Sequence, residues 1–216
     1  MQVASGKWGL GVLLLLLLVA CGNGVAGKVG ADLLFREEFV PGQTARWEIE
    51  GDDLGHTAVL NEQLVINLEA PNILQYSALT DQSFQDFILE VDARQVSGEL
   101  SNSYGVLFRM QGPSQFYRLE ITGEGNYVLE RRNADGSWTR FVDEWTPSEA
   151  IKQGYNVTNR IRIEANGAQV SAYVNGVLVG QFNDATYTAG QIGLDAGTFG
   201  SPEMQAAFDN VVVWQP

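Results

Sequence analysis

The segment "FILEVDARQ", residues 87–95, contains acidic residues whose spacing could support catalysis. Alternate side chains of a β-strand point to the same face, so Glu90, Asp92 and Arg94 are expected to share one face. Retaining glycoside hydrolases use two carboxyl groups about 5 to 5.5 Å apart, and one strand face can bring two such groups this close. The same pattern is also typical of a charged ladder on a solvent-facing strand. In either case the opposite face must be apolar, and the residues that would form it are Phe87, Leu89, Val91 and Ala93.

The other nucleophiles and bases of the chain form no recognisable catalytic arrangement. His56 is the only histidine and lies in the loop-like segment "GDDLGHT", where a Ser-His-Asp triad stays a formal alternative. Cys21 is the only cysteine. The sequence has no glycine-rich phosphate loop and no histidine or cysteine cluster with metal-ligand spacing. These residues favour a protein that is not an enzyme, although they leave catalysis open.

From Asp32 onward, short alternating segments are separated by turn residues, without a long helical period. Many short strands at this spacing predict an all-β antiparallel sandwich formed by residues 32–216. Only Thr146 to Gly154 predicts a turn of helix, with Ser148 and Glu149 at its start. The expected strands are 33–39, 58–60, 64–68, 73–79, 87–96, 104–110, 116–122, 127–132, 138–142, 160–165, 169–174, 177–182, 191–195 and 207–214.

Two Asn-Gly pairs, at residues 166–167 and 175–176, predict consecutive β-hairpins. Two-residue type I′ turns at both pairs would fix the register of three strands. The pairs predicted in this way are Ile163 with Val170, Ile161 with Ala172, Val174 with Val177 and Ala172 with Val179. The face expected in the core contains Ile161, Ile163, Val170, Ala172, Val174, Val177 and Val179.

The N-terminus predicts export. Lys7 precedes an apolar stretch, Trp8 to Val19, that is too short to cross a bilayer core of roughly 30 Å as a helix. The following "LVAC", ending at Cys21, resembles the lipobox of bacterial lipoprotein signal peptides, in which the cysteine is lipidated and becomes the new N-terminus. An ordinary secretory signal is the alternative. We therefore predict a signal peptide in residues 1–20, and a lipidated cysteine with a flexible glycine-rich tether in residues 21–31.

These features set the expected environment and partners of the domain. A lipid-modified Cys21 would hold it on the extracytoplasmic side of a bacterial cell membrane or outer membrane. The chain has 13 Lys and Arg against 26 Asp and Glu, a net charge of −13, which disfavours nucleic acid as a partner. A single cysteine allows no disulfide within one chain. The oligomeric state stays open.

Six stretches carry the hairpin and core patterns of a known superfamily: "YGVLFRM", "FYRLEITGEGNYVLERR", "GSWTRFVDEW", "NRIRIEANGAQVSAYVNGVLV", "GQIGLDAG" and "AAFDNVVVW". They resemble the concanavalin A-like lectin/glucanase superfamily, and within it the laminin-G-like and 3-keto-disaccharide hydrolase-like branch. The resemblance extends from about Leu33 to Trp214. It implies a jelly-roll sandwich of two curved antiparallel sheets, whose concave face binds glycans in many relatives. Such motifs specify a fold far better than an activity.

The resemblance also implies what a catalytic version of the segment at Glu90 should contain. Glycosidases of the laminarinase kind carry the pattern E-x-D-x-x-E on one strand, which supplies a nucleophile, an assisting Asp and an acid/base Glu. Here Glu90 and Asp92 are followed by Arg94, with Gln95 at the bulged position, so the last carboxylate is absent. No group of this motif could then protonate the leaving oxygen, which argues against retaining hydrolysis.

Related jelly rolls often hold a structural calcium ion where the first and last strands meet. In this chain the side chains at those ends are Glu37, Glu38 and Asp209. Calcium takes about six to eight oxygen ligands, many of them from the backbone, so a sequence reveals only part of such a site. A calcium ion is thus the one cofactor that the resemblance suggests, and capped strand ends with solvated carboxylates are the alternative.

Three functions are compatible with these observations. The first is a non-catalytic, lectin-like domain that binds a glycan or polysaccharide. The second is a glycan-processing enzyme of the 3-keto-disaccharide hydrolase-like type, and the third is a structural interaction domain of the cell envelope. Sugars are bound by aromatic rings and by polar side chains that contact hydroxyl groups. The candidates for such contacts are Arg94, Arg109, Arg118, Glu120, Trp138, Trp145 and Tyr173.

Overall fold

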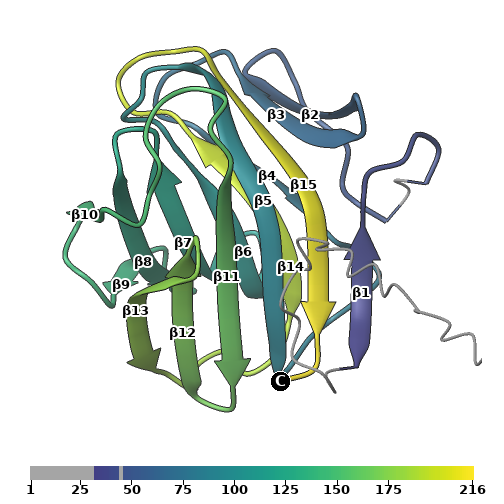
Figure 1. Ribbon diagram of the computed structural model, residues 1–216, viewed down its shortest axis with the longest axis vertical. Coiled ribbons are helices and arrows are strands. Elements are labelled where there is room, and N and C mark those ends of the chain that lie inside the picture. The colour runs from purple at the N-terminus through teal and green to yellow at the C-terminus, as the bar shows by residue number, and fades with distance from the viewer. Residues whose placement is uncertain (1–31, 44–45) are drawn as a thin grey trace, which may run out of the picture.

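The computed structural model describes residues 32–43 and 46–216, which form two antiparallel β-sheets packed face to face (Figure 1). This confirms the all-β jelly-roll sandwich expected from the sequence. The predicted signal peptide (1–20) and tether (21–31) lie outside the described residues. Within the described part of the chain, no helix is long and apolar enough to cross a membrane.

The larger sheet has the strand order β13-β12-β11-β5-β15-β3-β2, and β1 also pairs with β15. The first and last strands of the domain are therefore neighbours, as Figure 1 shows. The strands of this sheet are β1 (Leu33–Glu37), β2 (Gly55–Leu60), β3 (Gln63–Leu68), β5 (Phe87–Gly98), β11 (Asn159–Asn166), β12 (Gln169–Val174), β13 (Val177–Asn183) and β15 (Met204–Trp214).

The smaller sheet has the order β10-β8-β7-β6-β14-β4, with β9 paired to β8. Its central strands β6 and β7 form a hairpin, whereas β14 comes from near the end of the sequence and separates β6 from β4. The strands of this sheet are β4 (Leu74–Ala78), β6 (Ser103–Gly112), β7 (Gln115–Thr122), β8 (Asn126–Arg132), β9 (Trp138–Arg140), β10 (Thr146–Pro147) and β14 (Gln191–Gly197).

Strict alternation of apolar residues decides which face of each strand enters the core. Leu89 and Val91 of β5 point into the space between the sheets, and Leu119 and Ile121 of β7 do so from the other side. Because the side-chain period of a strand is two, the residues between them must point outward. The core thereby exposes one polar face on each sheet.

The turn predicted for the second hairpin, β12–β13, is confirmed, whereas the first hairpin, β11–β12, has another register than predicted. Asn175 and Gly176 both have positive φ, as a type I′ turn requires, and Val174 pairs with Val177. At the first hairpin Gly167 and Ala168 form the turn, which moves the register by two residues. The observed pairs are Ile163 with Ala172, Ile161 with Val174 and, through a bulge in the second hairpin, Ala172 with Gly180.

An even register shift leaves every residue on its predicted face, so most of the hairpin core is as expected. Val177 is the exception, with 54% of its surface exposed, because it lies at the tip of the hairpin on edge strand β13. The turn of helix expected from Thr146 to Gly154 was also wrong. Strand β10 pairs with β8 there, and a tight turn in which Ile151 donates to the carbonyl of Ser148 follows it.

Replacing Gly176 by Val should destabilise the domain by about 1 to 3 kcal/mol, because a β-branched residue would be forced to positive φ. The φ of Gly176 is +83°, and an added Cβ would meet nothing within 4 Å, so the effect isolates backbone strain. Denaturant unfolding of Gly176→Val and of the matched control Gly112→Val measures it. Gly112 has equal space around it without positive φ. Equal destabilisation by the two substitutions would contradict the type I′ turn.

Candidate functional site

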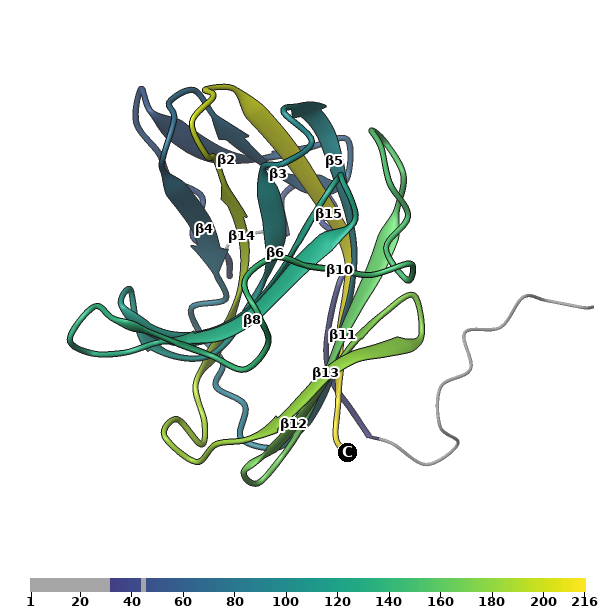
Figure 2. The same cartoon turned by 90° about the vertical axis from the view of Figure 1, so that its left-hand side faces the viewer.

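The smaller sheet carries a second apolar cluster on the side turned away from the core. Ala78, Leu107, Met110 and Phe116 are buried there, although they lie outside the space between the sheets. Aromatic side chains that pack against them cover this cluster in part. We call this outward side of β4, β6, β7, β8, β9 and β14 the open face; Figure 2 shows how strongly the sheet curves between β4 and β8.

Beside this cluster, a row across β7, β6 and β14 brings two carboxyl groups together. Glu120 pairs with Gly105, and Gly105 pairs with Asp195, so the two acidic side chains flank a residue that has no side chain. A Cβ at Gly105 would lie 2.0 Å from the carbonyl oxygen of Leu119, which only glycine avoids. Glu120 and Asp195 are both fully buried.

Arg118 is the only cation in direct contact with these acids among the described residues. Its Nη1 lies 3.0 Å from Glu120 Oε2, and its Nε and Nη2 donate to Glu130 Oε1 at 2.8 and 2.5 Å. Arg140 reaches the second oxygen of Glu130 at 3.4 Å. Arg118 is therefore held by carboxylates on both sides, with only 11% of its side chain exposed.

The environment of Asp195 favours its neutral form. Burial is the first cause that raises its pKa well above the usual value, and the charge of Glu120 is the second, whereas Arg118 acts in the opposite direction. In the described structure neither oxygen of Asp195 accepts a hydrogen bond from a donor group. When Asp195 is protonated it no longer needs a donor partner, because its own O–H can donate a hydrogen bond toward Glu120.

Aromatic residues lie at two edges of the open face. The ring of Trp138 covers Arg118, whose Cζ is 4.1 Å from the ring centroid, and it also contacts Arg132 at 4.8 Å. Tyr76 of β4 lies at the other edge, where burial and the charges of Glu48 and Glu50 raise its pKa. A groove of about 290 Å³ opens beside Arg118 and Glu120. The site thus places hydrogen-bonding groups of both charges next to an aromatic ring.

Three residues expected to contact a ligand meet on this face: Arg118, Glu120 and Trp138. Asp195, Glu130 and Tyr76 also belong to it and were missed. Alternation within "LDAG" and "VLERR" could have placed Asp195 and Glu130 on outward faces. The sequence contained no sign that β14 lies beside β6.

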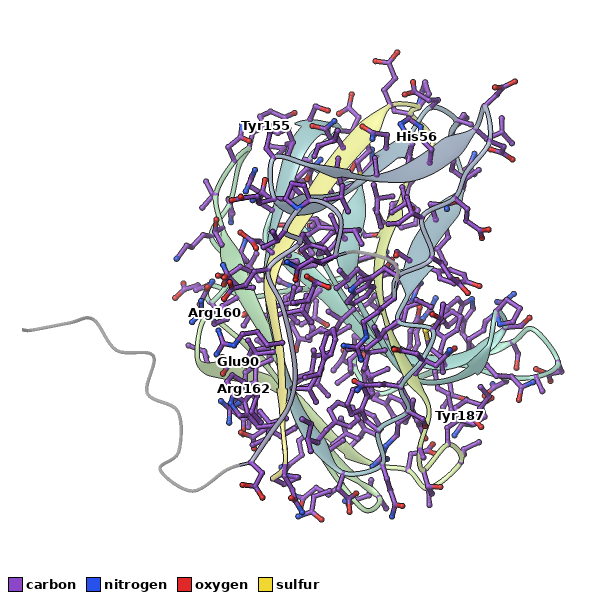
Figure 3. The ribbon with its side chains drawn as sticks, turned by 90° about the vertical axis from the view of Figure 1, so that its right-hand side faces the viewer. His56, Glu90, Tyr155, Arg160, Arg162 and Tyr187 are labelled. Atoms are coloured by element: carbon purple, nitrogen blue, oxygen red, sulfur yellow. The ribbon has the colours of Figure 1, made fainter. Side chains whose placement is uncertain are left out.

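Two other candidates, Arg94 and Tyr173, lie on the outward face of the larger sheet and do not join this site. Arg94 donates to Gln63 at 2.5 Å, and Tyr173 lies 3.5 Å from Glu164. The acidic residues beside them form a ladder of ion pairs: Glu90 accepts from Arg162 at 2.6 Å, and Asp92 accepts two bonds from Arg160, each 2.8 Å long. Figure 3 shows Glu90, Arg160 and Arg162 side by side on this sheet. His56 lies well away from this ladder in the same view.

Arg109 was expected on an outward face and is instead fully buried. A bulge follows Phe108, and Arg109 itself has a φ of +49°, which breaks the alternation of β6 at this point. Its guanidinium donates to the carbonyl of Gln85 at 2.8 and 3.2 Å and to that of Tyr187 at 3.4 Å. Arg109 therefore holds the loops at Gln85 and Tyr187 together.

The residues suggested for calcium do not come together. Glu37 faces the interior and accepts hydrogen bonds from the backbone N–H groups of Glu38 and Phe39 at 3.0 and 2.7 Å. Asp209 pairs with Asp92 on the outward face of the larger sheet. Within the described residues, no group of three or more His, Cys, Asp or Glu could hold a metal ion.

A family model described as a 3-keto-alpha-glucoside-1,2-lyase-like domain matches residues 37–213, nearly the whole sandwich. The chain therefore belongs to this family. A search of curated proteins finds no match.

Solved structures share the fold at low sequence identity. A carbohydrate-binding module, CBM66 of Bacillus subtilis, is 18% identical with a TM-score of 0.61, over 79% of this chain and 96% of the module. The β-glucanase of Bacillus licheniformis is 13% identical with a TM-score of 0.60, over 86% and 98% of the two chains. A putative glycosyl hydrolase of Parabacteroides distasonis is 14% identical with a TM-score of 0.53, over 79% and 88%. The fold is thus that of both carbohydrate-binding modules and glycoside hydrolases.

The wild-type protein should become less stable as the pH rises, because Asp195 then loses its proton. The substitution Asp195→Asn should abolish this pH dependence. A carboxyl group whose pKa is raised by folding binds more proton in the folded state, so its contribution to stability falls between its unfolded and folded pKa values. One such proton changes the free energy of unfolding by about 1.4 kcal/mol per pH unit in that window. The wild type should therefore lose stability relative to Asp195→Asn above about pH 4.

Urea unfolding of both proteins at a series of pH values from 4 to 8 measures this difference. Asp143→Asn is the matched control, because Asp143 is exposed. A stability difference between wild type and Asp195→Asn that does not change with pH would contradict a raised pKa at Asp195.

Proposed function

We propose that the open face of the smaller sheet binds carbohydrate without hydrolysing it by a retaining mechanism. The observation that carries this proposal is Arg118, held between Glu120 and Glu130 beneath the ring of Trp138. The family assignment and the folds shared with carbohydrate-binding proteins support a sugar as the ligand.

The chemistry of this site suits a polyhydroxylated ring. A sugar presents hydroxyl groups that accept hydrogen bonds, and the guanidinium of Arg118, whose side chain is 11% exposed, can donate to them. The apolar side of a sugar ring can cover an aromatic ring such as Trp138. The ion pairs fix Arg118 before a ligand arrives, so little side-chain entropy is lost on binding.

The state of the acids argues for binding over retaining hydrolysis. Such a mechanism needs two carboxyl groups that reach the same glycosidic bond. Glu120 and Asp195 are fully buried, and Glu130 is occupied by Arg118 and Arg140. On the larger sheet, Glu90 and Asp92 are bound to arginines.

Replacing Trp138 by Ala should weaken glycan binding about tenfold or more, which corresponds to ~1.4 kcal/mol, while the fold is retained. Trp138 is only partly buried and lies on short strand β9, so its removal leaves the core intact. Isothermal titration with soluble β-glucan, xylan and peptidoglycan fragments measures the affinity. Arg118→Ala is a poorer test, because it would leave buried carboxylates unpaired.

Tyr173→Ala provides the matched control, since Tyr173 is also a partly buried aromatic residue but lies on the larger sheet. It should bind like the wild type. Equal loss of affinity in both variants would contradict the open face as the binding surface. The absence of heat with any glycan would favour a structural interaction domain of the envelope.

A second candidate is catalysis on 3-keto sugars, which the description of the family names. The observation that favours it is the pair Glu120 and Asp195, in which one carboxyl group holds a proton beside another. The carboxyl pair would have to become accessible for this, because it is buried in the described structure. Incubation with a chromogenic 3-keto-α-glucoside tests this candidate: release of the chromophore by the wild type, and its loss in Glu120→Gln, would assign catalysis to this face.

We further propose that the domain is displayed on a membrane as an exported lipoprotein. "LVAC" before a glycine-rich segment supports this. Cys21→Ala should move the protein from the membrane fraction to the soluble fraction of its bacterial host. Mass spectrometry of the wild type should identify a diacylglyceryl cysteine at residue 21, and an unlipidated mature N-terminus elsewhere would contradict the proposal.

A further inference from the structure

Two grooves of about 290 Å³ each meet at Phe199. The first lies beside Arg118 and Glu120, and the second lies between Thr122 and Trp145. Phe199 belongs to the lining of both. Each groove alone is at the lower limit for a small-molecule site, whereas a ligand that occupied both would be well within the usual range of roughly 300 to 1,000 Å³.

The grooves lie above a row of residues with small side chains, which leave space over the sheet. Across β7, β6, β14 and β4 the residues that pair in turn are Thr122, Ser103, Gly197 and Leu74, and the first three of them are small. The adjacent row contains Glu120 and Asp195, whose side chains are larger. From β4 to β8 the sheet spans four strand spacings, about 19 Å at ~4.8 Å each, which exceeds the width of one sugar ring.

Phe199 is exposed although its backbone is firmly held. Its side chain is 43% exposed, whereas its N–H donates to Oδ1 of the fully buried Asn102 at 3.0 Å. On either side of it, Thr198 donates to the carbonyl of Ala70 at 2.7 Å, and the N–H of Gly200 donates to Asn72 at 3.2 Å. An aromatic ring fixed in solvent at the junction of two grooves is ready to cover a ligand.

The ring of Trp145 contacts that of Phe199, and we call this pair the aromatic corner. The two rings are 5.4 Å apart and inclined at 72°, so they meet edge to face. The strand pairing of Thr146 with Tyr127 places Trp145 next to β8. Polar groups line the grooves as well: Asn126 and Glu124 in the second, and in the first Glu120, whose Oε2 lies near Arg118 without accepting a hydrogen bond from a described residue.

We propose that Trp145 and Phe199 form a second sugar subsite, so that the ligand of the open face is an oligosaccharide that crosses the strands from β4 to β8. This inference rests on the proposed carbohydrate binding and specifies the ligand as a chain longer than a disaccharide. The subsite at Arg118 and Trp138 binds one part of the chain, and the corner at Trp145 and Phe199 covers the next.

The test is the dependence of affinity on chain length. Laminari-oligosaccharides and xylo-oligosaccharides from disaccharide to hexasaccharide are titrated into the wild type, Phe199→Ala and the double variant Trp145→Ala/Phe199→Ala. The affinity of the wild type should rise at least about tenfold from disaccharide to hexasaccharide. Both variants should lose most of this rise. Leu178→Ala is the matched control, because Leu178 is 50% exposed on the larger sheet.

The outcomes separate the two proposals. Binding by the wild type that is weakened by Trp138→Ala, but independent of chain length and of Phe199, would overturn the second subsite alone. No binding of any oligosaccharide by the folded wild type would overturn both. A rise of affinity with chain length that survives in both variants would also overturn the inference, because neither ring would then contact the longer chain.

Discussion

The packing of apolar residues between the two sheets is the constraint on which the rest of the molecule depends. Leu89 and Val91 on one side, and Leu119 and Ile121 on the other, determine which face of each strand is buried. Because the period of a strand is two, burial of Leu119 and Ile121 forces Arg118 and Glu120 outward. The open face is thus a consequence of the core, and a register change of one residue would remove it.

The charges on the open face are stable only as a group. Arg118 is nearly buried, and a buried charge without a partner destabilises a protein by about 3 to 5 kcal/mol. Glu120 and Glu130 provide that partner on opposite sides, and a neutral Asp195 avoids a third negative charge in the same place. A rigid set of donors and acceptors results, which a ligand meets without first having to order it.

The two polar faces of the sandwich contain similar residues in different arrangements. On the larger sheet, ion pairs join neighbouring strands: Arg160 binds Asp92, and Arg162 binds Glu90. On the smaller sheet, one arginine serves two acids beside an apolar cluster and two grooves. In the second arrangement the ring of Trp138 lies against Arg118, and the rings of Trp145 and Phe199 meet beside a groove, which is why the proposed ligand is placed on this face.

The sequence by itself determined the strands, the fold and the residues that point outward, because alternation and Asn-Gly turns are local properties of the chain. It placed Arg118 and Glu120 on an outward face for this reason. It was wrong about Arg109, where a bulge interrupts the alternation, and about Val177, where a hairpin extends beyond the core. Only the tertiary structure decided that Asp195 lies beside Glu120 and Phe199 beside Trp145, because these contacts depend on which strands are neighbours. Strand order is set by the packing of residues far apart in sequence, which no local pattern records.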